Sequence, residues 1–93
     1  MADRIGTLVA NTVTSVDVQA ERVEVLNRDG AAEIFVRIGS TAPTVGSTDP
    51  ATFCVPAVAG AARVFYEDIS GNDKTQTVKL ISSGTPAYSV QPL

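Results

Sequence analysis

The chain has 93 residues, of which 44% are apolar and only 5% aromatic, and its formal charge is −3. This length suits one domain, because two independent cores would each be too small to fold. Valine, alanine and threonine dominate over leucine and lysine, which favours strands over helices. The sequence has no histidine and one cysteine, which excludes histidine-based catalysis, histidine metal sites and an internal disulfide.

The 7 basic residues are scattered along the chain. We therefore expect no nucleic-acid partner, because affinity for phosphates needs clustered cations. We expect no membrane partner either, since no apolar run approaches the roughly 20 residues that span a bilayer. The first residues include Asp3 and Arg4 and lack an apolar stretch, so we expect no signal peptide. The single cysteine indicates synthesis in a reducing compartment.

Residues 1–20 contain few large aliphatic side chains and many β-branched ones. β-Branched side chains lose conformational freedom in a helix, so extended structure is favoured. Two forms remain open, an extended N-terminal arm and an edge strand. An arm could add residues 7–16 as a strand to a neighbour's sheet. The predicted organisation is therefore an arm or edge strand over 1–20 and a β-sandwich domain over 21–93.

The clearest predicted element pair is a β-hairpin. Charged and apolar residues alternate over 21–26 and again over 33–38, as in half-buried strands. The turn signal between them, Asn27 to Gly30, ends in a glycine that tolerates positive φ. We expect Glu24 and Arg37 to pair across this hairpin on its solvent face. The expected core face comprises Val23, Val25, Ile34, Val36 and Ile38.

The rest of the chain predicts short strands separated by turns. Residues 39–52 contain two prolines and two glycines and predict a long irregular loop, which either contacts a partner or is mobile. Further strands are expected at 52–55, 63–67, 75–82 and 87–90. With about six or seven short strands, the predicted fold class is all-β, a small antiparallel β-sandwich or barrel.

Candidate chemical groups are few. Cys54 lies between apolar residues and is expected to be a small buried core residue. The acidic loop 68–73 lacks the spacing of a calcium loop and is expected to be a plain turn. The carboxylates considered as a glycosidase pair, and interpreted instead as solvated positions, are Glu21, Glu24, Glu33, Glu67 and Asp68. We therefore assign no catalytic, cofactor-binding or metal-binding residue, and expect a protein that is not an enzyme.

Two strands carry apolar side chains on both faces. Phe35 alternates with the core-facing Ile34 and Val36, and Phe65 lies between Val64 and Tyr66. One face of each sheet in a two-layer sandwich is normally solvated. A loop that covers the outer apolar residues, or a subunit contact, would each explain this pattern.

Three stretches resemble a known group of proteins: VEVLNRDGAAEIFVRIG at 23–39, APTVG at 42–46 and TVKLISSGTPAYSV at 77–90. They look like small virion proteins of tailed bacteriophages that infect actinobacteria. The resemblance covers residues 21–93, and its motifs are structural. It implies a β-rich module in a symmetric assembly, with the major capsid protein or other virion proteins as partners.

Three functions are therefore considered. The first is a capsid decoration or minor capsid protein that binds and stabilises the capsid shell. Such a protein would form homo-oligomers. It would be located on the virion surface after assembly in the host cytoplasm. The second is a tail or head–tail joining component that forms a ring. The third is a carbohydrate- or protein-binding module, although so few aromatic residues offer little surface for stacking against sugars.

Overall fold

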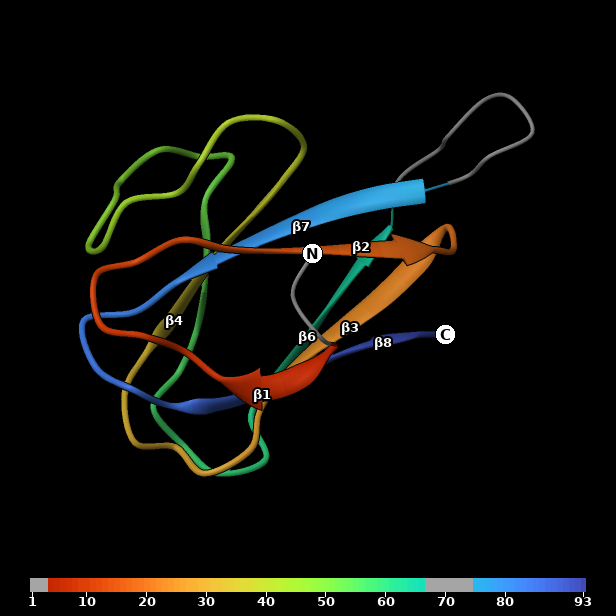
Figure 1. Ribbon diagram of the computed structural model, residues 1–93. Helices are drawn as coiled ribbons and strands as arrows, with labels where there is room; N and C mark the ends of the chain where they lie inside the picture. The colour runs from red at the N-terminus through yellow and green to blue at the C-terminus, as the bar shows by residue number, and fades with distance from the viewer. Residues whose placement is uncertain (1–3, 67–74) are drawn as a thin grey trace.

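The computed structural model describes residues 4–66 and 75–93. Eight antiparallel strands form two four-stranded sheets in this part of the chain (Figure 1). Sheet A has the order β1 (Ile5–Thr7), β8 (Ala87–Pro92), β3 (Arg22–Asn27) and β6 (Ala62–Tyr66). Sheet B has the order β2 (Thr14–Gln19), β7 (Thr75–Ile81), β4 (Ile34–Ile38) and β5 (Phe53–Val55). The prediction of an all-β fold is confirmed, with eight strands rather than six or seven.

The core lies between the two sheets and consists mainly of valine. Alternate residues of each strand point inward, so short β-branched side chains from both sheets interdigitate. Each fully buried valine or leucine contributes about 1.5–3 kcal/mol relative to an exposed one. The side chains with no exposed surface include Val16, Val23, Val25, Ile34, Val36, Val55, Val78, Leu80 and Val90. All core-facing positions predicted for 21–38 are therefore buried except Ile38, which is half-buried.

The amino-terminal segment belongs to the two sheets. β1 pairs with β8 at the edge of sheet A, and β2 pairs with β7 at the edge of sheet B. Leu8, which directly follows β1, is 1% exposed and part of the core. Two forms were open for residues 1–20, an extended arm and an edge strand. Residues 4–20 contain two edge strands, each of which is hydrogen-bonded along one side to its own sheet.

The predicted hairpin between β3 and β4 is wrong. β3 pairs with β6 and β8 in sheet A, whereas β4 pairs with β5 and β7 in sheet B. Residues 28–33 therefore carry the chain from one sheet to the other. The predicted pair of Glu24 and Arg37 is wrong for the same reason, because these residues lie in different sheets.

A buried asparagine organises this crossing. Asn27 has no exposed surface, and its Nδ2 donates to the carbonyl oxygens of Ala32 (2.8 Å) and Pro56 (2.9 Å). Its Oδ1 accepts the N–H of Gly30 at 2.9 Å. Gly30 has a φ of 69°, and a Cβ there would collide with backbone atoms of Ala59. The crossing at 28–33 is thus fastened to the β5–β6 connection by one side chain and one close backbone approach.

A second buried amide holds the crossing between β2 and β3. Gln76, in β7, is 2% exposed, and its Nε2 donates to the carbonyl oxygens of Ala20 (2.9 Å) and Glu21 (2.6 Å). Satisfying these carbonyls is needed because unpaired buried polar groups are costly. Gln76 was not recognised from the sequence as a core residue.

Candidate docking surface

The open edges of the two sheets meet at β5 and β6, the last strands of sheets B and A. The rings of Phe53 and Phe65 contact each other edge to face, with centroids 5.4 Å apart and an interplanar angle of 62°. Such pairs add about 0.5–1.5 kcal/mol to the burial of the rings. The contact joins the two edges, and both rings line a groove of about 440 Å³.

Two arginines lie over aromatic rings at this groove. The guanidinium carbon of Arg63 is 5.3 Å from the Phe53 centroid, and that of Arg22 is 5.8 Å from the Tyr66 centroid. Tyr66 and Val64 are more than half exposed, at 57% and 56%. Aromatic residues and arginine are the types enriched in protein–protein interfaces, because they combine large apolar surface with directed polar contacts.

The backbone of β6 is paired on one side. The N–H of Asn27 in β3 donates to the carbonyl oxygen of Ala61 at 2.8 Å, so the backbone of Asn27 points toward β6. Successive residues of an antiparallel strand point their N–H and C=O groups to opposite sides. Val25 and Val23 therefore bond to their partners in register, Arg63 and Phe65. The β6 residues whose N–H and C=O groups face the open edge are Ala62, Val64 and Tyr66.

β6 differs from the other three edge strands of the described chain. β1 and β5 span only 3 residues each. The backbone N–H and C=O groups of Asp17 face the open edge of β2. Its partner in register, Thr77 in β7, accepts the N–H of Gly39, so the backbone of Thr77 points toward β4 and away from β2. Short length and charge are the usual devices that prevent edge-to-edge pairing. β6 has 5 residues, and the three whose backbone faces its open edge, Ala62, Val64 and Tyr66, are uncharged, so this edge is the one best suited to accept another strand.

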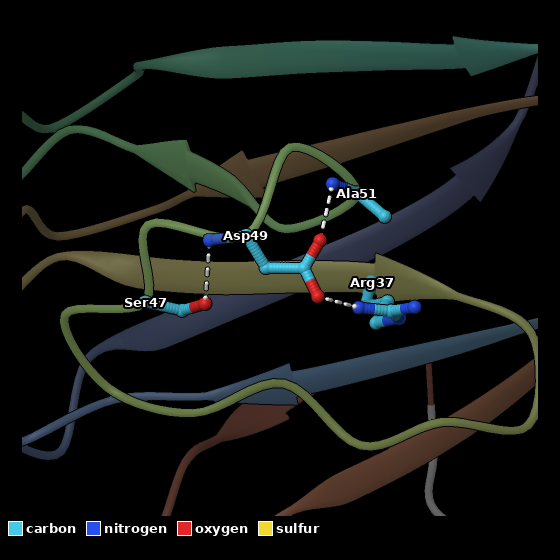
Figure 2. Close-up of polar contacts among 4 residues, drawn as sticks. All are labelled: Arg37, Ser47, Asp49 and Ala51. Atoms are coloured by element: carbon cyan, nitrogen blue, oxygen red, sulfur yellow. Dashed lines mark hydrogen bonds and ion pairs between the residues drawn. The ribbon is translucent and has the colours of Figure 1, made fainter.

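The long loop 39–52 is pinned to sheet B (Figure 2) and contributes Ala51 to the lining of the groove. Arg37 Nη1 donates to Asp49 Oδ2 at 2.6 Å, and the N–H of Ala51 donates to Asp49 Oδ1 at 2.9 Å. Ser47 Oγ accepts the N–H of Asp49 at 3.1 Å. The bond from Ala51, together with that from Arg37, holds the pKa of Asp49 below its ordinary value. This clamp positions Ala51, which lines the groove two residues before Phe53.

Cys54 is half-buried, so the prediction of a core position is wrong. The register of β4 with β5 points Phe53 and Val55 inward and Cys54 outward. Its Sγ donates to Glu33 Oε2 at 3.2 Å. Burial and, after it, the neighbouring Glu33 carboxylate raise the pKa of Cys54 to about 11. The thiol is therefore almost fully protonated at neutral pH, which makes it a poor nucleophile.

The carboxylates considered from the sequence are not brought together where the structure describes them. Glu24 lies on sheet A and Glu33 lies beside β4 in sheet B. Glu67, Asp68 and the rest of loop 68–73 lie outside the described residues. Residues 4–66 and 75–93 contain no group of three side chains arranged to hold a metal ion.

Comparison of the chain with protein-family models, curated proteins and solved structures finds no match. In the described part of the chain, no helix is long and apolar enough to cross a membrane.

Proposed function

We propose that this chain is a structural protein of a bacteriophage virion, which docks onto the capsid surface as a decoration or minor capsid protein. The observation that carries the proposal is the surface at β5 and β6. There, a strand edge that no other described strand pairs with runs beside exposed aromatic side chains that arginines cover. The resemblance of residues 21–93 to small phage virion proteins supplies the class of partner, a shell of major capsid protein.

The sandwich suits such a role for a physical reason. A domain of this size buries only about 60–65% of the surface of its unfolded chain, so its own core is marginal. Contacts that remove Tyr66 and Val64 from water add to the stability of a docked copy. An unpaired strand edge also gains main-chain hydrogen bonds when another strand joins it.

Co-sedimentation tests the proposal. The purified chain is mixed with capsids of the phage that encodes it, assembled without this protein, and the particles are pelleted. We expect the chain to pellet with the capsids in a saturable manner. A chain that stays in the supernatant at every capsid concentration overturns the capsid role.

A tail or head–tail joining role is the second candidate, and it is favoured by the two different open edges of sheet A. The β6 edge of one copy can pair with the β1 edge of the next, which is a heterologous contact. Repeated contacts of this kind close into a ring when the rotation between neighbouring copies is a whole fraction of a turn. Electron microscopy of labelled virions separates the two roles, since a joining protein lies at one vertex and a decoration protein lies over the whole shell.

A further inference from the structure

We propose that the partner of the open β6 edge is a second copy of this chain, paired antiparallel with Val64 opposite Val64 of the partner subunit. This inference rests on the proposed role in assembly. It assigns the strand edge to a second copy and leaves the outer face of the joined strands, with Val64 and Tyr66, to the capsid. The N–H and C=O groups of Ala62, Val64 and Tyr66 face the open edge, as the alternation from Asn27 shows. A two-fold axis at Val64 therefore brings together about six main-chain hydrogen bonds.

The side chains of β6 are complementary to themselves in this register. On the outer face the small Ala62 lies opposite the large Tyr66 of the partner subunit, and the two Val64 side chains meet at the axis. On the inner face Arg63 lies opposite Phe65 of the partner subunit, so each cation has an aromatic ring beside it. Both relations hold in both directions, because the two-fold axis repeats every contact.

The other described edges lack this self-complementarity. Two copies of β2 joined about Asp17 would place two carboxylates opposite each other, which is destabilising. The three residues of β1 or β5 would supply fewer hydrogen bonds. Pairing through β6 instead makes sheet A continuous across two copies and removes the longer of its two open edges.

Two substitutions at Val64 test the register. Val64→Pro removes the central donor of the open edge and leaves the bonds of β3 to Arg63 and Phe65 in place. Val64→Lys puts two cations opposite each other on a side chain that is 56% exposed. The matched control is Ser15→Pro in β2, because the N–H of Ser15 also faces an open edge. Its partner in register, Lys79, lies two residues from Thr77, so the backbone of Lys79 likewise points toward β4 rather than β2.

Sedimentation velocity over a concentration series measures the outcome, with circular dichroism to establish that each variant is folded. We expect the unchanged chain and Ser15→Pro to form dimers, and both Val64 variants to remain monomers at concentrations at least tenfold higher. Hydrogen exchange of the amides of Ala62, Val64 and Tyr66 should slow as the concentration rises, whereas that of Asp17 should not.

A chain that is monomeric at all concentrations, or a dimer that persists in both Val64 variants, overturns the inference. These outcomes are distinct from failure of the proposed function. A monomer that still pellets with capsids contradicts the β6 dimer alone. A dimer that ignores capsids, and whose β6 amides are protected, contradicts the capsid role alone.

Discussion

Asn27 illustrates how one residue can determine a connection between sheets. Its side chain makes three hydrogen bonds without any exposed surface. We expect Asn27→Ala to lower the free energy of unfolding by about 2–4 kcal/mol, because it removes three hydrogen bonds of a fully buried side chain and leaves a cavity in its place. Urea denaturation followed by circular dichroism measures the change.

Asn27→Asp is the informative companion to this variant. Its carboxylate still accepts the N–H of Gly30 but cannot donate to Ala32 or Pro56. We expect it to be at least as destabilising as Asn27→Ala at neutral pH, because a buried charge then faces two carbonyl oxygens. A loss below about 0.5 kcal/mol for both variants would show that the amide does not hold the crossing.

Gly30 and Gly46 provide a matched comparison of space and backbone strain. Both have positive φ, 69° and 73°, but only a Cβ at Gly30 would collide with the backbone of Val58 and Ala59. Gly46→Ala should lower the free energy of unfolding by about 1 kcal/mol from strain alone. Gly30→Ala should lower the free energy of unfolding by about 2 kcal/mol more than Gly46→Ala does, because the β3–β4 and β5–β6 connections must move apart to make room for the Cβ. Equal losses in thermal denaturation would contradict the close approach at Gly30.

Cys54 and Glu33 make a prediction about thiol reactivity. Burial, together with the hydrogen bond to Glu33 and the charge of its carboxylate, raises the pKa of Cys54 from an ordinary 9.0 to about 11. Glu33→Gln should lower this pKa and speed alkylation by iodoacetamide several-fold at pH 9, since the thiolate is the reactive form. Glu24→Gln, in the other sheet, serves as the control and should leave the rate unchanged. Identical rates for both variants would remove Glu33 as a cause.

At the scale of elements, the alternation of apolar and charged residues predicted strands but not their partners. β3 and β4 each place their apolar residues toward one core, and this pattern is the same for a hairpin and for two strands in facing sheets. The choice depends on distant strands, because β8 and β6 occupy both sides of β3. Asn27 is a local feature of the crossing, but the sequence does not show its role. That role depends on a hydrogen bond to Pro56, which is 29 residues away in the chain.

The loop clamp at Asp49 makes the element-scale prediction. The pKa of Asp49 lies below its ordinary value of 3.8, so its contribution to stability is present above about pH 3.8 and is lost as the pH falls through the lower folded-state pKa. Asp49→Asn should therefore lower the melting temperature at pH 7. The difference from the unchanged chain should shrink toward zero in acid.

Thermal denaturation of both proteins between pH 2 and pH 7 measures this effect, with Asp17→Asn in β2 as a control at a position outside the loop. High salt should also reduce the difference at pH 7, because exposed ion pairs are screened. A difference between Asp49→Asn and the unchanged chain that is constant across this pH range would contradict the carboxylate as the anchor.

For the whole molecule, the sequence predicted the all-β class and the core faces of β3 and β4, because a period of two identifies inward positions without knowledge of neighbours. It also showed that Phe65 has apolar neighbours on the opposite face. It could not show that Val64 and Tyr66 lie at an open edge, since edge position is a property of strand order. The contacts of Arg63 with Phe53 and of Arg22 with Tyr66 likewise join residues from different strands.

The proposed dimer makes stability depend on concentration. Binding of a second copy to the folded chain stabilises it by mass action, so the melting temperature should rise by about 3–5 °C for each tenfold increase in protein concentration above the dissociation constant. Val64→Lys should melt at a temperature that does not change with concentration, because it cannot pair through β6. Calorimetry over two decades of concentration measures both slopes. Equal rises for the two proteins would place the stabilising contact elsewhere on the molecule, since only the β6 edge differs between them, and two flat slopes would contradict the dimer itself.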